Sequence, residues 1–171
     1  TYNSVMLSWK KSSDATRYYV YRSTKSDKGY KKIATTTKTS YKDSKVKTGT
    51  TYYYKVVASR KVSSKYYTSE MSSSVKKKPS LAKGVVTKTS AGVAKVQLTY
   101  KKVSGAKGYQ IYRATSKNGT YKKVATTKKT TYTNKKLSRK KTYYYKVRAY
   151  RVVNGKMVYG SFSSIVSKKT K

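Results

Sequence analysis

The side chains most often used for acid–base catalysis near neutral pH, histidine and the carboxylates, are absent or few in this chain of 171 residues, and the few are scattered. The chain has no histidine and no cysteine, and its carboxylates are Asp14, Asp27, Asp43 and Glu70. Acid–base catalysis needs such groups within reach of one reacting atom, glycosidases need two carboxylates beside one bond, and hard metal ions need clustered oxygen ligands. The four carboxylates fall in different expected loops or strand ends, so we expect no enzymatic activity, no metal site and no cofactor. Asp27 and Asp43 are interpreted as turn residues, whose side chains bond the local backbone.

Positive charge is the main binding chemistry of the chain. Lysine and arginine number 43 against four acids, which gives a formal net charge of +39. A surface of this charge attracts almost any polyanion and gains affinity by releasing counterions. The strongest local run predicts a polyanion-binding segment that contains Lys135, Lys136, Arg139, Lys140 and Lys141.

The 21 tyrosines supply a second kind of binding chemistry. Successive side chains of a strand face opposite sides, so if Tyr143, Tyr145 and Val147 face a core, their neighbours face outward. Gln110 and Tyr112 on the adjacent expected strand then face outward too. Tyrosine rings stack on bases or sugars, and guanidinium groups pair with phosphate or sulfate. The outward side chains define a candidate ligand face made of Tyr112, Tyr144, Lys146, Arg148 and Tyr150.

The same residues also have a purely structural interpretation. Lysine stems cover apolar strands, and lysine charges keep exposed strand edges from pairing with other chains. Tyrosine is a favoured strand residue whether or not a ligand is present. The sequence alone leaves both interpretations open.

A repeated unit of 91 residues must position these side chains. Trp9 and Tyr100 are separated by this interval, and residues 30–36 are nearly identical to residues 121–127. The interval is longer than the roughly 20–50 residues of solenoid repeats. It matches a small domain, which for a β-sandwich is about 100 residues. The chain is therefore expected to be two copies of one module.

The boundary between the modules is expected at residues 76–80, where three lysines precede the only proline. Proline cannot donate to a sheet ladder, and adjacent lysines avoid a core. We predict one module over residues 1–78 and a second over residues 79–171.

Alternation of apolar and polar residues predicts an all-β fold. Residues 5–9 and 109–113 alternate strictly, and no segment shows helical spacing. Tight turns are expected at Asn118-Gly119 and Asn154-Gly155, because both residue types tolerate positive φ. Short strands, regular turns and no helix indicate two β-sandwiches.

Residues 46–58 resemble the signature of fibronectin type III modules, with an apolar residue, Gly-Thr, Tyr, Val and Ala at the expected spacing. Residues 137–149 repeat this signature, with Lys140 in the glycine place. The blocks at 108–113 and 118–123 are similar to those of tandem type III modules from bacterial, mostly Gram-positive, surface and secreted proteins.

This resemblance implies specific positions in each module. Trp9 and Tyr100 should be equivalent and buried, and Tyr52 and Tyr143 should be tyrosine-corner residues whose hydroxyls bond nearby backbone. The first strand is expected to be missing or very short in the first copy, and to lie within residues 83–90 in the second. The parent protein is therefore expected to continue upstream.

Fold and charge together predict a non-catalytic adhesion or spacer pair from a larger surface or secreted protein, located outside the cell. The expected partners are anionic polymers (teichoic acid, glycosaminoglycan or mucin glycans, extracellular DNA) or host cell-surface proteins, with no small-molecule substrate. Two alternatives are a secreted ligand that acts on a host receptor and an accessory module of a secreted carbohydrate-active or cell-wall enzyme. No stretch approaches the ~20 apolar residues of a membrane span, so no transmembrane segment is expected.

Overall fold

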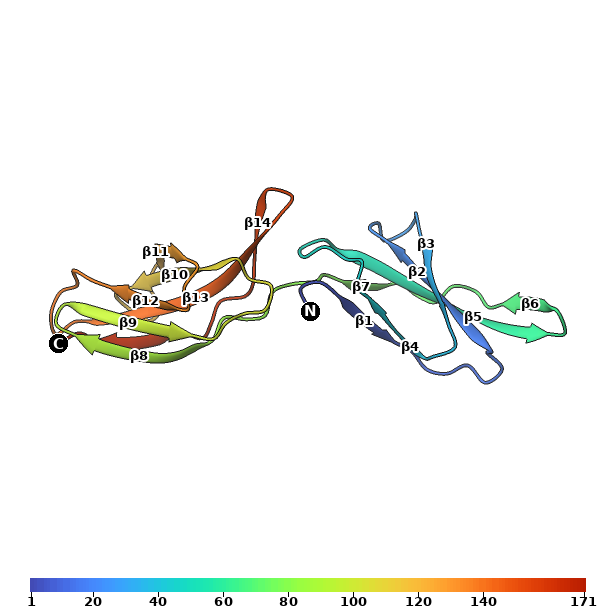
Figure 1. Ribbon diagram of the computed structural model, residues 1–171, viewed down its shortest axis with the longest axis horizontal. Helices are drawn as coiled ribbons and strands as arrows, with labels where there is room; N and C mark the ends of the chain where they lie inside the picture. The colour runs from blue at the N-terminus through green and yellow to red at the C-terminus, as the bar shows by residue number, and fades with distance from the viewer. The chain divides into compact units, whose positions relative to one another are not determined.

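The computed structural model describes every residue from Thr1 to Lys171 and consists of strands joined by loops (Figure 1). The chain divides into two compact units, built from Asn3–Pro79 and from Ser80–Lys171. None of its segments is a helix long and apolar enough to cross a membrane.

The first module contains seven strands. In chain order they are β1 (Val5–Ser8), β2 (Arg17–Ser23), β3 (Lys31–Thr36), β4 (Ser40–Asp43), β5 (Tyr52–Val62), β6 (Lys65–Thr68) and β7 (Val75–Lys77). One sheet pairs β1 with β4, and the other has the order β3-β2-β5-β6, with β7 also paired to β5.

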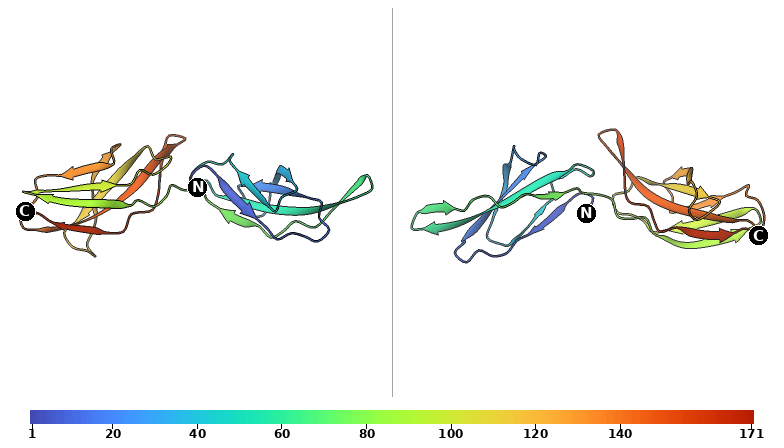
Figure 2. Two further views of the ribbon diagram at one scale, coloured as in Figure 1. Left: turned by 60° about the horizontal axis from the view of Figure 1, so that its bottom comes forward. Right: turned by 180° about the vertical axis from the view of Figure 1, so that it is seen from behind.

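The second module repeats this topology and adds one strand at its start. In chain order its strands are β8 (Val86–Gly92), β9 (Lys95–Tyr100), β10 (Gly108–Ala114), β11 (Lys122–Thr127), β12 (Thr131–Asn134), β13 (Thr142–Val153), β14 (Lys156–Tyr159) and β15 (Val166–Lys169). One sheet has the order β12-β9-β8, and the other has the order β11-β10-β13-β14, with β15 also paired to β13. Figure 2 shows β8 beside β9 from two further directions. The prediction of two all-β sandwiches is confirmed.

Alternation along the strands builds the core of each module. The second module buries completely Val96, Leu98, Ile111, Tyr145, Val147 and Ala149. The core of the first module is smaller and consists of Val5, Leu7, Val20, Val46, Tyr52 and Tyr54. Within each strand these residues lie on one face, as the period of two requires.

Trp9 and Tyr100 are equivalent but not equally buried. Each ring packs against a tyrosine at the equivalent position of the next strand. Trp9 packs on Tyr18 with ring centroids 5.5 Å apart, and Tyr100 packs on Tyr109 with ring centroids 4.8 Å apart. Tyr100 is only 2% exposed, whereas Trp9 is half-buried and its Nε1 has no hydrogen-bond partner. The prediction that Trp9 is buried is therefore wrong in degree.

The missing neighbour of β1 explains this difference. In the second module β8 pairs along β9 and covers its edge. In the first module β1 pairs with β4 alone, and a groove of about 350 Å³ lies over Leu7, Trp9, Tyr54 and Val56. Trp9 is exposed on the side where the second module has its additional strand.

The tyrosine corner is confirmed in both modules. The Tyr52 hydroxyl accepts a hydrogen bond from Lys47 N, and the Tyr143 hydroxyl accepts one from Ser138 N, each 3.0 Å long. Hydrogen bonding to Ser138 lowers the pKa of Tyr143. These bonds fix the loop that enters β5 or β13 against its strand.

Only one of the two predicted Asn-Gly turns has the expected backbone. Asn154 and Gly155 join β13 to β14 with φ values of 50° and 74°, as predicted. A turn is also present at Asn118-Gly119, but neither residue has the positive φ that was expected there. The longer loop between β10 and β11 is closed instead by Gly119 N, which donates to Ser116 O at 3.3 Å. A loop of this length does not need the two-residue turn that selects positive φ.

Candidate functional site

The candidate ligand face lies on β10 and β13 of the second module. These strands pair so that Tyr112 is opposite Lys146, and Gln110 is opposite Arg148. Cross-strand neighbours on one face are close enough for their side chains to interact. The side chains of these four residues therefore lie together on one face of the sheet.

Arg148 lies at the centre of this surface and is held by hydrogen bonds. Its Nε and Nη2 donate to Gln110 Oε1 at 3.1 and 2.9 Å, and Nη2 also donates to the Tyr112 hydroxyl at 2.9 Å. Gln110 is only 3% exposed, so its amide is a fixed acceptor. The guanidinium group is thus oriented before any ligand arrives.

Aromatic rings surround the same guanidinium. Its carbon lies 3.8 Å from the ring centre of Tyr159, 4.8 Å from Phe162 and 5.2 Å from Tyr112. Tyr112 and Phe162 meet edge to face at 5.0 Å. Attraction between a cation and an aromatic face grows as the pair loses water. We call Gln110, Tyr112, Arg148, Tyr159 and Phe162 the Arg148 cluster.

A lysine–tyrosine pair borders the cluster and recurs in the first module. Lys146 Nζ lies 4.3 Å from the ring centre of Tyr121, and Lys55 Nζ lies 5.0 Å from that of Tyr30, one repeat earlier. Burial raises the pKa of Tyr121, with a smaller contribution from Tyr144. The pair is common to both modules, whereas the position of Arg148 is held by Val57 in the first.

The two remaining residues of the candidate face differ in accessibility. Tyr144 is half-buried, beside Tyr121. Tyr150 is only 7% exposed, because its ring lies over Gly108, where an added Cβ would be 2.7 Å from the ring. Tyr150 offers little surface to a ligand.

The candidate ligand face predicted from the sequence did not include Tyr159 or Phe162. Tyr159 follows the Asn154-Gly155 turn and pairs with Tyr150 in the ladder, so alternation from that turn could have placed it on the outward face. Phe162, the only phenylalanine, lies after β14 outside any strand, where no periodic signal exists.

The basic run lies on the loop between β12 and β13. All five of its cations are exposed: Lys135, Lys136, Arg139, Lys140 and Lys141. The loop is anchored by buried Leu137 and by the bond from Ser138 N to the corner tyrosine. Residues 80–171 contain no aspartate or glutamate, so no acidic side chain of this module offsets the run.

The carboxylates of the first module form separate ion pairs. Asp14 Oδ2 lies 3.4 Å from Arg60 Nη1, with both side chains well exposed, and Asp43 Oδ2 lies 2.7 Å from Arg22 Nη1. No three histidine, cysteine, aspartate or glutamate side chains lie close enough together to hold a metal ion.

Asp43 is more than a turn residue, so the prediction of a turn role alone is incomplete. Its Oδ1 accepts from Lys45 N at 2.9 Å, which is the expected turn bond. Its Oδ2 accepts from Arg22 and also from the Tyr54 hydroxyl at 2.9 Å, in a site where Asp43 is only 1% exposed. Burial, together with the bond to Asp43, raises the pKa of Tyr54. The partner Arg22 lies 21 residues away, so local sequence could not reveal the pair.

Comparison with known proteins supports the fold. No family model and no curated protein matches the chain. The chain is similar to a solved two-domain fibronectin type III segment of chicken tenascin, at 16% identity and a TM-score of 0.52, over 98% of this chain and 91% of that one. It is also similar to the FN1–FN3 domains of chicken CNTN1, at 18% identity and a TM-score of 0.45, over 99% of this chain and 63% of that one. The chain thus spans a little under two thirds of the CNTN1 segment.

The fold class is therefore defined. The two units are tandem β-sandwiches of the fibronectin type III kind, in agreement with the tyrosine corners and the strand order of both copies.

Proposed function

We propose that the two modules form an extracellular adhesion or spacer unit whose cationic surface associates with anionic polymers. Candidate polymers are teichoic acid, glycosaminoglycan or mucin glycans, and extracellular DNA. The resemblance of residues 108–113 and 118–123 to bacterial surface modules supports a secreted or surface-attached protein of bacterial origin.

One observation carries this proposal, namely the scarcity of ion pairs. Of 43 lysines and arginines, only Arg22 and Arg60 lie within 4.0 Å of a carboxylate. The other 41 must draw their counterions from solution. A polyanion that displaces those ions gains free energy from their release.

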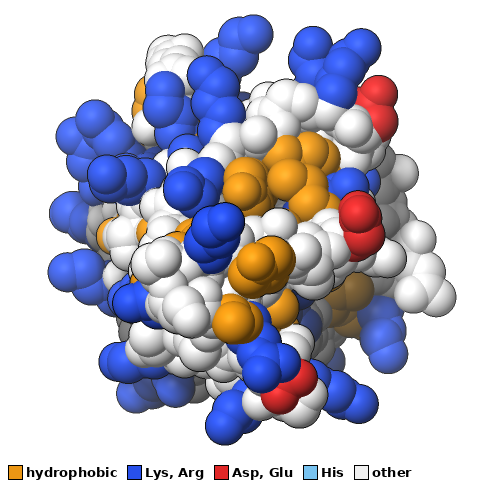
Figure 3. Space-filling view, turned by 90° about the vertical axis from the view of Figure 1, so that its right-hand side faces the viewer, with side chains coloured by type: hydrophobic (Ala, Val, Ile, Leu, Met, Phe, Trp, Pro, Cys, Tyr) orange, Lys and Arg blue, Asp and Glu red, His pale blue; other side chains and the backbone are white.

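The distribution of charge favours the second module as the stronger binder. All four acidic residues lie in the first module. Figure 3 shows one end of the first module, where blue cations surround an orange apolar area and the few red acidic groups lie among them. The second module has no acidic side chain and presents the exposed loop run from Lys135 to Lys141.

A second candidate function is binding to a host cell-surface protein, and the Arg148 cluster favours it. Tyrosine and arginine are enriched among the residues that dominate protein interfaces. An arginine already oriented by Gln110 and stacked on Tyr159 loses little freedom on binding. A receptor-binding protein would use this cluster, whereas nonspecific charge would not need it.

The test is binding of the intact chain to heparin and to duplex DNA as salt is raised. The logarithm of affinity should fall linearly with the logarithm of salt concentration, with a slope of about 0.9 per DNA phosphate neutralised. Replacing Lys135, Lys136, Lys140 and Lys141 by alanine should weaken binding more than replacing an equal number of first-module lysines. No binding to either polymer at physiological salt, where the Debye length is about 8 Å, would refute the proposal.

A double variant separates nonspecific charge from a dedicated ligand face. Tyr112→Ala/Tyr144→Ala removes no charge, whereas Lys76→Ala/Lys77→Ala removes two charges outside the face. Stacking is worth about 1–3 kcal/mol per base, so a dedicated face predicts a larger loss from the tyrosine pair that persists at high salt. An equal or smaller loss from the tyrosines would eliminate the face and leave charge alone.

A further inference from the structure

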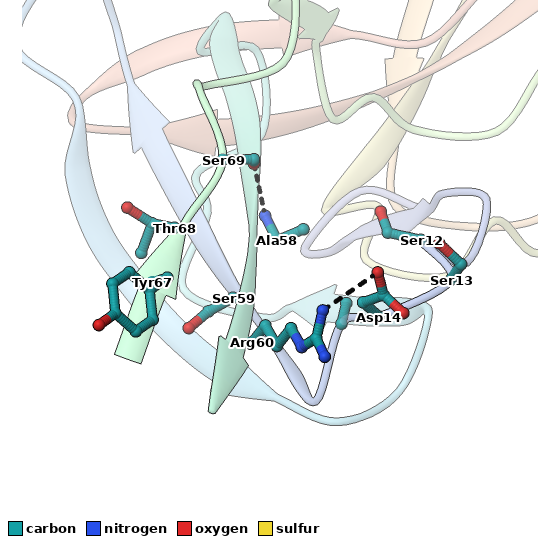
Figure 4. A pocket seen from close by; sticks show the side chains of 10 residues that line it. Ser12, Ser13, Asp14, Ala58, Ser59, Arg60, Tyr67, Thr68 and Ser69 are labelled. Carbon is teal, nitrogen blue, oxygen red and sulfur yellow. Dashed lines mark hydrogen bonds and ion pairs between the residues drawn. The ribbon is translucent and has the colours of Figure 1, made fainter. Parts of the chain in front are cut away.

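The first module pairs its carboxylates with its own arginines. The buried carboxylate of Asp43 accepts a hydrogen bond from Arg22 at 2.7 Å. Figure 4 shows the other carboxylate–arginine pair of this module, in which Asp14 lies beside Arg60. Each pair supplies an arginine with a counterion from within the chain.

The second module keeps one of these arginines without its counterion. One repeat after Arg22 stands Arg113, and one repeat after Asp43 stands Asn134. The amide of Asn134 is 6% exposed, and its Nδ2 donates to the Tyr145 hydroxyl at 3.2 Å. Asn134 therefore keeps the shape of the Asp43 site and its bond to a tyrosine, but it carries no negative charge.

Arg113 has no partner for its N–H groups inside the chain. It is half-buried, and it makes no hydrogen bond and no ion pair with another residue. Its contact is with the ring of Tyr143, whose centre lies 5.2 Å from the guanidinium carbon. None of its nitrogens is fully buried. The five N–H donors of a guanidinium are thus accessible to a ligand from solution.

The charges around Arg113 are all positive. Lys122 lies opposite Arg113 in the β10–β11 ladder. The loop that carries the basic run is bonded to the Tyr143 hydroxyl through Ser138 N. This hydrogen bonding lowers the pKa of Tyr143 most, and the nearby charges of Lys141 and Arg113 lower it further. Arg113 and the basic run therefore lie around one tyrosine, in a module without any acidic side chain.

We propose that Arg113 and the basic run bind a pendant sulfate or carboxylate group of an anionic glycan. The planar guanidinium takes two oxygens of one such group, as Arg22 takes the carboxylate of Asp43 in the first module. The loop lysines contact neighbouring groups of the same glycan chain. The inference rests on the proposed attraction to anionic polymers and names the group and the arginine of one site.

Duplex DNA fits this site less well than a glycan does. Its phosphates are fixed within a stiff backbone whose persistence length is about 50 nm. A half-buried guanidinium is reached more easily by a group that projects from a flexible chain. The site therefore favours glycans among the candidate polymers.

Asn134→Asp tests the proposal by restoring the internal anion. The new carboxylate should accept from Arg113, which then has less to offer a ligand. Asn154→Asp is the matched control, because it makes the same change at an exposed turn at the far end of β13. Calorimetric titration of the intact chain with a heparin tetrasaccharide should show about tenfold weaker binding for Asn134→Asp. The control should lose less than twofold.

Arg113→Gln gives a second test that does not need a new ion pair to form. It should weaken tetrasaccharide binding about tenfold, whereas Lys156→Gln, which removes a charge from exposed β14, should cost less than twofold. For duplex DNA the two variants should cause small and equal losses. A hyaluronan tetrasaccharide, which carries carboxylates and no sulfate, distinguishes the two groups: a loss with Arg113→Gln assigns the site to carboxylates, and no loss assigns it to sulfate. Far-UV circular dichroism and thermal melting verify that each variant is folded.

Equal losses of heparin affinity from Arg113→Gln and Lys156→Gln, and from Asn134→Asp and Asn154→Asp, would overturn the proposal, because net charge alone would then set affinity. A loss for duplex DNA as large as the loss for the tetrasaccharide would overturn the assignment to a pendant group. In both cases binding by the parent chain would leave the proposed function intact. Absence of binding by the parent chain would instead refute the proposed function itself.

Discussion

Lys140 has the same left-handed backbone as Gly49, its counterpart one repeat earlier, with φ values of 53° and 83°. Glycine adopts this conformation without steric cost, whereas a residue with a Cβ loses roughly 1–2 kcal/mol. The second module therefore carries backbone strain at the start of β13 that the first module avoids.

Lys140→Gly is expected to stabilise the second module by about 0.5–1 kcal/mol, since relief of strain exceeds the added flexibility of the unfolded chain. Chemical denaturation followed by circular dichroism measures the change. Lys141→Gly is the control, because it removes the same charge from a residue without positive φ, and it should destabilise the module. A lower midpoint for Lys140→Gly would show that this lysine makes an interaction worth more than the strain.

Asp43→Ala should destabilise the first module by about 3 kcal/mol. The change leaves Tyr54 and Lys45 N without their acceptor and leaves Arg22 with only Lys45 O, and breaking a buried pair from one side costs roughly 3–5 kcal/mol. The lower end applies because the Arg22 side chain is 24% exposed.

Asp14→Ala is the matched control for Asp43→Ala. Its pair with Arg60 is exposed, and exposed pairs contribute at most about 1 kcal/mol. Fluorescence of Trp9, the only tryptophan, reports unfolding of this module alone. Equal losses from the two variants would mean that the buried pair contributes no more than a surface pair.

Trp9→Ala should cost less stability than Tyr100→Ala, although tryptophan is the larger side chain. Tyr100 is almost fully buried and its hydroxyl donates to Lys129 O at 3.0 Å, whereas Trp9 is half-buried. We expect about 2 kcal/mol for Trp9, against the usual range of roughly 3–5 kcal/mol for Tyr100. Differential scanning calorimetry would measure both changes in stability. A larger loss of stability from Trp9→Ala would contradict the conclusion that the edge of β1 is uncovered beside Trp9.

High pH should destabilise the second module through Tyr145. Complete burial raises its pKa to about 12, against roughly 10 in the unfolded chain. The raised pKa means that its contribution to stability is complete below pH 10 and is lost as pH rises from about 10 to 12.

Tyr145→Phe isolates this effect, because the lysines lose charge over the same range in both proteins. The difference in unfolding free energy between parent and variant should be constant below pH 9 and then shift in favour of the variant. Denaturant titrations at pH 8, 10 and 11.5 measure it. A difference independent of pH would show that Tyr145 ionises in the folded state as readily as in the unfolded state.

Local pattern was sufficient to predict the architecture. The 91-residue interval and the alternation of residues such as 109–113 depend only on neighbours in sequence, because a strand turns successive side chains to opposite faces. That rule also placed Lys146 and Arg148 on one surface with Tyr112, before any pairing was known. The corner tyrosines Tyr52 and Tyr143 followed from a short motif whose bonding partner lies five residues away.

Only the tertiary structure decided how each surface is used, because packing depends on residues distant in sequence. Phe162 comes from a loop beyond β14 to cover Arg148, Arg22 crosses to Asp43, and Tyr150 is buried because Gly108 opposite it has no side chain. The same ladder position holds Ser59 in the first module, where Arg17 takes the place of Gly108 opposite it. Alternation states which side of a sheet a residue faces, whereas the depth of burial and the identity of its neighbours arise only when separate strands and loops meet.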